Sequence, residues 1–583
     1  MVTSNSEVAK LLREVAAAYT ISKTGNVFEI RAYENAADSI EGSTAEIKDL
    51  WEEGQLDQIP GLGKSLRAYL NELFKTGIVK HFESVKSDIP SIVFELLNIP
   101  GVGPKTAQEL AKLGVKSLDG LKKGIKSGEL VKKGFSAKIA EKIIQGVEEV
   151  EGQSDKRMLL PYASAQADRI LDYLKENSDV MEAHPLGSLR RMVATIGDLD
   201  FSAASKNPQK VVDYFVKMPG VSRVLEKGDN KASVALNSGI RVDLLVGEPE
   251  SYGALLQHFT GSKNHNIKLR MLALGKGLSL SEYGVKQTNR VGQPIIPTKT
   301  EEQLYELLKM DTPAPEIRED TGEIEAALKH QLPGLVELKD IKGDLHIHSN
   351  FPFPNPSHGP GANFIEEMVK KAKELGYDFI GVSDHPPGHG VISKPDMIKA
   401  VEKRTNYIHN LKLKTKNIRV LNGLEIDILP DGTLSVPDEA LETLDYCIAG
   451  IHSGHRGGSE KITKRIISAL ENPHVDIISH PTNRLLNERD SSEAHWEEIF
   501  KVAAKNNKIL EINAYPNRLD LRDDLIKLAK EYGVKFVINT DAHAVDQMNN
   551  MPFGVSVARR GWAEKKDVVN TWTWTDFAKW FKL

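Results

Sequence analysis

The chain has 583 residues, too many for a single hydrophobic core, so we expect several domains. Hydrophobic residues make up 40% and charged residues 27%, which is ordinary for a globular protein, and no apolar run is long enough to span a membrane. The net charge of −5 excludes a surface that is basic throughout. The single cysteine, Cys447, excludes an intramolecular disulfide, and we expect a cytoplasmic protein without membrane contact.

Residues 1–150 have the pattern of short helices separated by glycines, and they contain an internal repeat. IPGLGK at 59–64 recurs as IPGVGPKTA at 99–107. In each copy a Gly-x-Gly turn leads into a helix whose first amides can bind a DNA phosphate without reading bases. An ordinary helix–helix turn is the alternative, but two copies, and nine lysines against three acidic residues in 101–140, favour DNA binding. The residues predicted to bind DNA are Gly61, Gly63, Gly101, Gly103 and Lys105.

From about residue 185 to 246, strand-like runs alternate with helices and carry three aspartates. Asp198 and Asp200 lie two positions apart in GDLDFSA, so on a strand both carboxylates face the same side. Asp243 lies inside the apolar run IRVDLLV, a placement that is costly unless its charge is compensated. Three clustered carboxylates suit two Mg²⁺ ions ~3.5–4 Å apart, which activate a 3′-hydroxyl and stabilise the leaving pyrophosphate. The pattern therefore predicts a nucleotidyltransferase centre.

A glycine-serine turn precedes these acids. Gly187 and Ser188 can bring the backbone close to a phosphate, and Arg190 and Arg191 supply cations for a triphosphate. A surface turn is the ordinary explanation of GDLD alone. The turn before it and the aspartate within an apolar strand after it favour the catalytic interpretation.

These residues resemble the family X DNA polymerases. The resemblance extends to RAYENAADSI (31–40), DKRMLLP (155–161), HFTGSKNHNIKLR (258–270) and GLSLSEYGV (277–285). It implies that Asp198, Asp200 and Asp243 are catalytic and bind Mg²⁺ or Mn²⁺. It also implies that an incoming dNTP and its base pair are contacted by Arg157, Gly187, Ser188, Arg191, His258, Phe259, Gly261, Asn266 and Arg270.

From residue 341 onward, apolar strands alternate with amphipathic helices, the pattern of a parallel α/β barrel. The seven strand-like runs are KGDLHIHS, FIGVSDH, RVLNGLEID, YCIAGIHS, VDIISHP, KILEINA and KFVINTDAH. Because the carboxyl ends of parallel strands form the site of such a barrel, we expect their metal-binding residues to converge. One buried histidine has a structural explanation, but eight residues of metal-binding types recurring at strand ends favour a metal centre. They are His346, His348, His385, Glu425, His452, His480, Asp541 and His543.

This half is similar to the PHP (polymerase and histidinol phosphatase) domain, with HxH, SDH, a single Glu, IHS, SHP and TDAH in the family order. The resemblance implies a distorted seven-stranded barrel with up to three metals, and its mixed ligands suit Mn²⁺, Zn²⁺ or Fe²⁺. The family carries Ser-Asp-Gly soon after HxH, where this chain has Ser357-His358-Gly359 in a proline-rich loop. We expect His358 to replace the aspartate and bind the third metal with His385 and His480; an exposed loop histidine is the alternative.

We therefore expect a multidomain α+β and α/β protein with a helical N-terminal region, a nucleotidyltransferase palm with a small thumb, and a PHP barrel. The expected parts are an N-terminal helical DNA-binding domain (1–83), helix-hairpin-helix fingers (84–150), the palm (151–246), the thumb (247–316), a linker (317–340) and the PHP domain (341–583).

By resemblance, the chain is a DNA-directed DNA polymerase that fills short gaps in DNA repair, and its barrel is a metal-dependent 3′–5′ exonuclease, with cleavage at abasic sites left open. The expected partners are gapped or primer–template DNA and dNTPs, and the expected state is a monomer. One alternative is a non-polymerase nucleotidyltransferase joined to a small-molecule phosphatase, which the helix-hairpin-helix copies and HFTGSKNHNIKLR count against. The other is a DNA-binding scaffold with inactive sites, which the intact acids count against.

Overall fold

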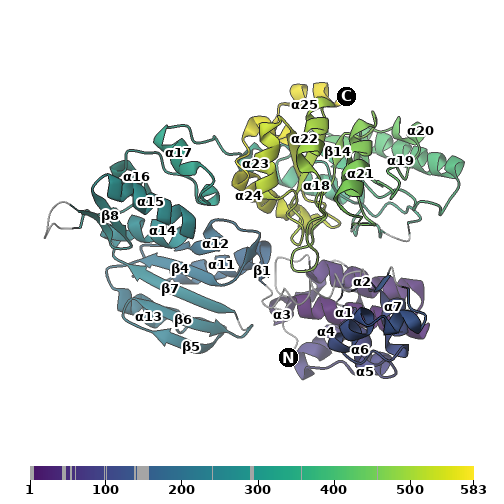
Figure 1. Ribbon diagram of the computed structural model, residues 1–583, viewed down its shortest axis with the longest axis horizontal. Coiled ribbons are helices and arrows are strands. Elements are labelled where there is room, and N and C mark those ends of the chain that lie inside the picture. The colour runs from purple at the N-terminus through teal and green to yellow at the C-terminus, as the bar shows by residue number, and fades with distance from the viewer. Residues whose placement is uncertain are drawn as a thin grey trace. The chain divides into compact units, whose positions relative to one another are not determined.

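The structure, a computed structural model, describes residues 5–41, 47–52, 55–59, 61–97, 99, 102–136, 139–140, 143, 157–238, 240–288, 295–355, 358–455 and 457–583. The chain forms two compact units (Figure 1). One contains Met1–Arg157 and Arg484–Asp490, and the other contains Met158–Asn483 and Ser491–Leu583. Among the described residues, no helix has the length and hydropathy needed to cross a membrane.

The N-terminal unit is built from helices with two hydrophobic cores. The first core joins α1 (Asn5–Ser22), α2 (Val27–Glu41), α3 (Ile47–Glu52), α4 (Lys64–Thr76) and α5 (Lys80–Lys86). Val8, Leu12 and Val15 recur on one face of α1 and are fully buried, the spacing of a helix packed on a core. The second core joins α6 (Ser91–Leu96), α7 (Pro104–Lys112), α8 (Leu118–Lys126) and α9 (Glu129–Lys132).

A five-stranded sheet forms the palm. Its strand order is β2 (Glu182–Pro185), β4 (Leu199–Ala204), β7 (Arg241–Gly247), β6 (Lys231–Leu236) and β5 (Val221–Lys227). β4 and β7 are parallel, and the other neighbours are antiparallel. The remaining elements are α11 (Leu160–Lys175), α12 (Gly187–Arg190), α13 (Pro208–Phe215) and the paired β1 (Met158–Leu159) and β3 (Thr195–Ile196).

The thumb follows the palm and packs around its own core. It consists of α14 (Tyr252–Thr260), α15 (Lys263–Gly275), the hairpin of β8 (Leu278–Ser281) and β9 (Gly284–Gln287), and α16 (Glu301–Leu307). Residues 317–340 are where we expect a linker. Near its start this segment contains the fully buried Arg318. It continues into α17 (Glu323–Leu328), where Glu323 Oε1 lies 2.6 Å from Nδ1 of buried His265. The first part of the segment therefore packs on the thumb.

Seven parallel strands form the C-terminal barrel in sequence order: β10 (Gly343–Asp344), β11 (Phe379–Val382), β12 (Arg419–Asp427), β13 (Tyr446–Gly450), β14 (Ile477–Ile478), β15 (Ile509–Asn513) and β16 (Lys535–Asn539). The main helices of this part are α18 (Ile365–Glu374), α19 (Lys394–Lys414), α20 (Asp438–Leu441), α21 (Ser459–Glu471), α22 (Trp496–Lys505), α23 (Asp523–Glu531), α24 (Met551–Arg560) and α25 (Trp574–Phe581). A parallel bridge between Ile347 and Ala542 joins the segments that follow the first and last strands, and it nearly closes the barrel. The predicted architecture is confirmed.

The two ends of the barrel differ in chemistry. Phe379, Tyr446 and Ile509 begin their strands and belong to one apolar core that Phe577 and Phe581 of α25 cover. The polar residues of the strands lie at their carboxyl ends, away from this core, as expected for an α/β barrel. The α25 end of the barrel is therefore packed with apolar side chains, and the opposite end carries the polar side chains that could form a site.

Candidate active sites

The three palm aspartates come together where β4 and β7 lie side by side. The strand register pairs Asp200 with Asp243, and Asp198 directly precedes β4. One carboxylate oxygen from each of the three lies within 4.8 Å of the others. Burial, together with repulsion from Asp198 and Asp243, raises the pKa of Asp200 to about 6. The cluster thus concentrates negative charge at one point, as a site for divalent cations requires.

The glycine-serine turn packs directly against this cluster. Gly187 has φ +55°, a conformation that favours glycine, and a Cβ there would lie 3.1 Å from Asp200 Oδ2. The Leu186 amide donates a hydrogen bond to the Asp200 carbonyl at 2.8 Å. Ser188 follows in the first turn of α12. The structure therefore brings the predicted phosphate-binding turn next to the predicted catalytic acids.

Arg190, which ends α12, and Arg191, which follows it, bind different carboxylates. Both nitrogens of the Arg190 fork donate to the Glu301 carboxylate, at 3.0 and 2.6 Å, and Arg190 also bonds Thr260. Arg191 donates through Nε to Glu319 at 2.9 Å and through Nη1 to the Thr260 carbonyl at 2.6 Å. Arg190 thus ties the palm to the thumb, and Arg191 lies beside Gly261, where an added Cβ would be 3.1 Å from its Nη1.

The thumb residues expected near the incoming nucleotide also lie together. Asn266 Nδ2 donates to the His258 carbonyl at 2.7 Å, and Arg270 Nη2 lies 3.1 Å from His258 Nδ1. The neighbouring Phe259 is 38% exposed, so its ring is available to a ligand. Arg157 ends the N-terminal unit, and its predicted contact with the triphosphate stays a prediction.

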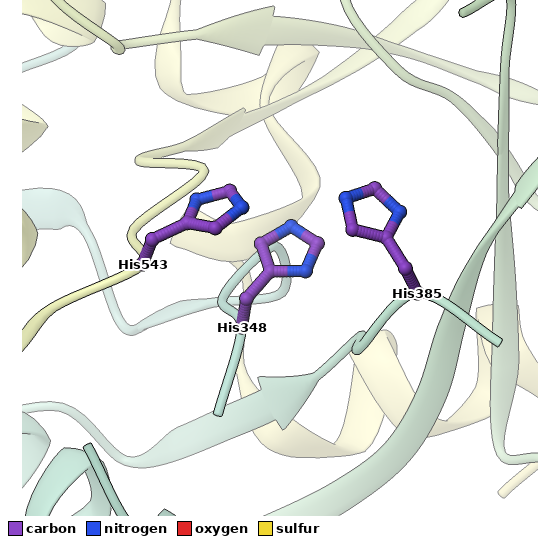
Figure 2. Close-up of side chains that lie close together, drawn as sticks. All are labelled: His348, His385 and His543. Atoms are coloured by element: carbon purple, nitrogen blue, oxygen red, sulfur yellow. The ribbon is translucent and has the colours of Figure 1, made fainter. Parts of the chain in front are cut away.

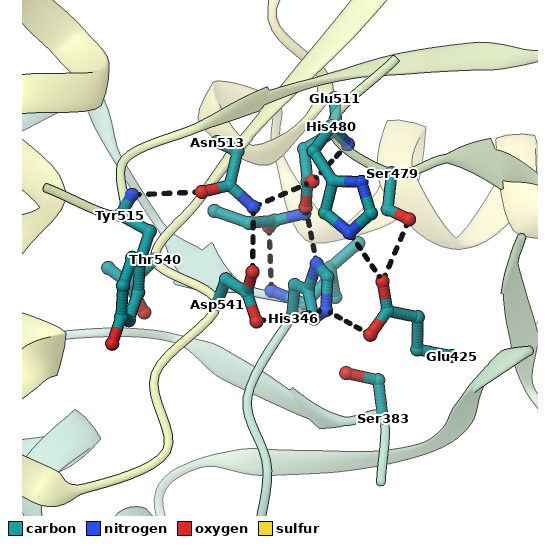
Figure 3. A network of polar contacts seen from close by, with 12 residues as sticks. His346, Ser383, Glu425, Ser479, His480, Glu511, Asn513, Tyr515, Thr540 and Asp541 are labelled. Carbon is teal, nitrogen blue, oxygen red and sulfur yellow. Dashed lines mark hydrogen bonds and ion pairs between the residues drawn. The ribbon is translucent and has the colours of Figure 1, made fainter. Parts of the chain in front are cut away.

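At the carboxyl ends of the barrel strands, the Glu425 carboxylate faces several imidazoles, two of which, His346 and His480, are drawn with it in Figure 3. Its Oε2 lies 3.1 Å from His346 Nε2, 3.6 Å from His348 Nε2 and 3.4 Å from His385 Nδ1. Its Oε1 lies 3.0 Å from His480 Nε2 and 3.3 Å from His452 Nε2. A single carboxylate therefore faces two groups of imidazoles, the geometry of a ligand that bridges two metals.

The surroundings of these groups fit metal ions. Two possible ligand sets share Glu425: one adds His346, His348 and Asp541, and the other adds His452 and His480. Nδ1 of His348 is buried without a hydrogen-bond partner, and Nε2 of His346 and Nε2 of His348 face the carboxylates of Glu425 and Asp541, at 3.1 and 3.2 Å. A buried nitrogen without a partner is costly, and a metal ion would compensate both the nitrogens and the carboxylates.

Two further barrel residues hold this centre in place, and the sequence reasoning missed both. Glu511 Oε1 lies 2.6 Å from His346 Nδ1, and its Oε2 accepts the His480 amide at 2.8 Å. Asn513 Nδ2 donates to Glu511 at 3.0 Å and to Asp541 Oδ2 at 3.1 Å (Figure 3). His480 and Asp541 both have positive φ, at 27° and 54°, a strained conformation that these bonds help to maintain. The missed signal was an acid inside the apolar strand KILEINA.

A second group of imidazoles extends from His348. The rings of His385 and His543 both lie close to the His348 ring and nearly parallel to it, with centroids 4.4 and 4.1 Å away (Figure 2). Their nitrogens form another possible metal-binding set. Burial, and then repulsion from His543, lowers the pKa of His348 to about 4. The imidazole is therefore neutral near pH 7, which is the form that binds metals.

His358 also lies at this centre, although it comes from the proline-rich loop. Its ring stacks on His385 at 4.2 Å, and its Nε2 lies 3.8 Å from Asp427 Oδ1. The ligand set that contains it is completed by Asp427 and His452, whose Nδ1 is 2.6 Å from the same Asp427 oxygen. The expected neighbour His385 is thus in contact, whereas Asp427 stands where we expected His480. Asp427 ends the strand RVLNGLEID. Like Glu511, it is an acid of a largely apolar strand that the sequence reasoning did not include.

In the N-terminal unit, the repeat glycines lie where helices begin. Gly61 has φ +77°, which requires glycine, and Gly63 and Gly103 are the N-caps of α4 and α7. A Cβ on Gly63 or Gly103 would meet no described atom within 4 Å, so packing does not explain either glycine. Lys105 is exposed in the first turn of α7. Gly101 lies outside the described residues.

Comparison with protein families gives four matches along the chain. Residues 3–79 match a helix-hairpin-helix domain, and residues 93–149 match a SAM-like helix-hairpin-helix tandem. Residues 255–319 match the DNA polymerase beta thumb, and residues 344–515 match the PHP domain.

Individual relatives fall into two groups. The DNA polymerase/3′-5′ exonuclease PolX of Bacillus subtilis is 35% identical over 568 residues, 97% of each chain. A probable phosphatase of Caldicellulosiruptor saccharolyticus is 33% identical over 196 residues, 32% of this chain and 75% of its own. A probable phosphatase of Thermoanaerobacter pseudethanolicus is 29% identical over 241 residues, 39% of this chain and 89% of its own. Because the first similarity runs through both the palm and the barrel, the chain belongs to the family X DNA polymerases of the PolX type, which carry a PHP domain.

Proposed function

We propose that the protein is a DNA repair polymerase that fills short gaps and trims 3′ ends as a 3′–5′ exonuclease. The observation that supports this most directly is the presence of two separate clusters of possible metal ligands with no shared residue. Three carboxylates gather in the palm, and histidines, Glu425 and Asp541 gather in the barrel. The full-length similarity to a DNA polymerase/3′-5′ exonuclease counts against both alternative functions.

In the palm, Asp198, Asp200 and Asp243 would hold Mg²⁺ or Mn²⁺. When bound, such ions lower the pKa of the primer 3′-hydroxyl and stabilise the charge on the leaving pyrophosphate. The amides of the Gly187 turn and the Arg191 guanidinium would bind the triphosphate oxygens. His258 and Phe259 would lie beside the sugar of the incoming dNTP, with Asn266 and Arg270 near the base pair. Arg157 would add a further cation for the triphosphate.

In the barrel, neutral imidazoles and carboxylates would hold up to three ions, of which Mn²⁺, Zn²⁺ and Fe²⁺ suit the mixed ligands. When bound, the metals supply hydroxide at neutral pH for attack on the terminal phosphodiester. Glu425 would bridge two of them, because each of its oxygens faces a different group of histidines. His358 would bind the third with Asp427 or with His385, since it contacts both. Cleavage at abasic sites would use the same centre.

The helix-hairpin-helix unit would bind the DNA backbone. Gly63 and Gly103 are exposed at the N-termini of α4 and α7, and Lys105 adds a positive charge in the first turn of α7. Such contacts suit gapped or primer–template DNA, with the protein acting as a monomer. Binding should weaken as salt rises, because each phosphate contact releases counterions.

The test is an assay of the purified protein on a gapped duplex whose primer is labelled at its 5′ end. With dNTPs and Mg²⁺ or Mn²⁺ the primer should lengthen until the gap is filled. Without dNTPs, and with Mn²⁺, it should shorten from its 3′ end one nucleotide at a time. Failure to extend the primer, with release of phosphate from small phosphomonoesters instead, would contradict the proposal.

A further inference from the structure

One carboxylate at the end of the thumb is shared by two arginines from different domains. Glu319 Oε1 accepts from Arg191 Nε of the palm at 2.9 Å and from Arg560 Nη1 of the barrel at 3.0 Å. Arg560 is the last residue of α24. The side chains of Arg191, Glu319 and Arg560 are 14, 26 and 9% exposed, so the contact is largely screened from water. It is therefore stronger than a surface ion pair.

Arg560 holds Arg191 at two places. Through Glu319 it fixes the guanidinium, and through Nη1 it also donates directly to the Arg191 carbonyl at 2.8 Å. Arg560 is itself anchored by Asp523 of α23, which accepts from Nε at 2.8 Å and lies 2.7 Å from Nη2. Two arginines and two carboxylates thus form a network in which the charges balance.

The orientation of the Arg191 guanidinium follows from these contacts. Arg191 Nε donates a hydrogen bond to Glu319, and Nη1 donates one to the Thr260 carbonyl at 2.6 Å. Within the described part of the chain, no hydrogen bond is formed by Nη2, so this nitrogen is the donor left for a ligand. A guanidinium held on two sides loses little conformational freedom when it binds phosphate, which favours binding.

We propose that Arg560 of the barrel is a positioning residue for nucleotide addition in the palm, because it fixes the triphosphate-binding Arg191 through Glu319. The inference rests on the proposed role of Arg191. It means that the nuclease domain sets the affinity of the polymerase for dNTPs. A network that serves only to join the domains would bring the same residues together, so the test must separate the two roles.

The neighbouring residue provides a matched control. Arg559 lies on the same helix and also joins the barrel to the preceding segment, with Nε 2.7 Å from Glu316 Oε1 and Nη1 donating to the Val336 carbonyl at 3.1 Å. It makes no described contact with Arg191 or Glu319. Arg559→Met therefore removes an interdomain ion pair without affecting the guanidinium of Arg191.

The experiment compares the KM for dNTP and the kcat of gap filling in Arg560→Met, Arg559→Met and the unaltered protein. We expect KM to rise about tenfold in Arg560→Met, in the range of effects that such networks produce, with kcat nearly unchanged. Glu319→Gln, which keeps the shape and loses the charge, should raise KM by a smaller factor. Exonuclease activity should stay unchanged in all three variants, which also reports that each is folded.

A double variant separates failure of this inference from failure of the proposed function. In an Arg191→Ala background, Arg560→Met should raise KM no further, because Arg560 acts through Arg191. Equal KM values for Arg560→Met and Arg559→Met would overturn the inference while leaving the role of Arg191 intact. An unchanged KM in Arg191→Ala alone would instead show that the proposed triphosphate contact is wrong, and the inference would fall with it.

Discussion

The two candidate centres of this protein are built in opposite ways. In the palm, three carboxylates lie at a partly exposed edge, and Asp198 is exposed. In the barrel, His346, His348 and Glu425 are at most 2% exposed, and hydrogen bonds hold the side chains of His346 and Glu425. A polymerase receives additional metal ligands from its substrate triphosphate, so an open site suffices. A nuclease that acts on a plain phosphodiester gains from ligands that the protein supplies in advance.

If the centres are separate, the largest effect should come from the palm. Asp200→Ala removes a carboxylate from the metal cluster and should lower nucleotide addition by ~10³-fold or more, because several kcal/mol of charge stabilisation are lost. The 3′-end digestion should remain. Primer extension and digestion on the same gapped duplex measure both. Asp213→Ala, a palm aspartate paired with Lys227 on the surface, is the control. Loss of both activities in a folded protein would contradict two separate centres.

The converse change lies in the barrel. His543→Ala removes an imidazole stacked on His348 and should lower 3′-end digestion by about a hundredfold, with gap filling retained. The rate of nucleotide release from a single-stranded oligonucleotide checks this. His409→Ala, an exposed histidine on α19, should change neither activity. Digestion at the rate of the unaltered protein would show that His543 is not part of the metal centre.

A smaller effect, on metal affinity, is expected for Glu511, which lies outside the predicted ligand sets but forms hydrogen bonds with residues within them. Glu511→Gln keeps its shape but weakens the bonds that orient His346 and the His480 backbone, so metal affinity should fall about ten- to hundredfold. Titration with a metal chelator, followed by metal analysis, measures this without reference to activity. Glu497→Gln, an exposed residue of α22, serves as control. Equal sensitivity to the chelator in both variants would show that Glu511 does not contribute to metal affinity.

The smallest effect is expected at His358, which comes from a loop and lies outside the two ligand sets that share Glu425. His358→Ala should lower the metal content by about one ion per chain and slow digestion a few-fold, since the two Glu425 sites remain. His358→Asp should restore the ion in part, because a carboxylate can occupy the same position. His389→Ala, an exposed histidine of a neighbouring loop, is the comparison. Metal content equal to that of the unaltered protein would show that His358 is a loop residue that binds no metal.

The sequence predicted those residues whose position along a strand fixes their position in space. In a parallel barrel every strand end reaches the same face, so His346, Glu425 and His480 could be brought together from their spacing alone. The same holds for Asp200 and Asp243 on neighbouring strands. Asp243 was recognised because it is an acid inside an apolar strand. Glu511 has the same kind of position, so the same argument would have identified it.

Contacts between distant side chains could not be predicted in this way. Arg190 pairs with Glu301, 111 residues further along the chain, and this partner depends on how the thumb packs on the palm. Arg318 lies in what the sequence indicates to be a linker, yet it is fully buried and binds the same Glu301. Proline and charge are typical of linkers, but they do not show whether a segment finds a partner. Only the packed thumb determines that.

The closing seam of the barrel has a consequence for how the protein is made. Asp344, the last residue of the first strand, accepts hydrogen bonds from Thr540, which follows the last strand 196 residues later. His346 and His348 cannot meet Asp541 until both edges are joined. On the ribosome, the palm and thumb are synthesised completely before the nuclease centre can assemble. A chain interrupted before residue 540 would therefore carry the palm aspartates and an open barrel that lacks Asp541 and His543.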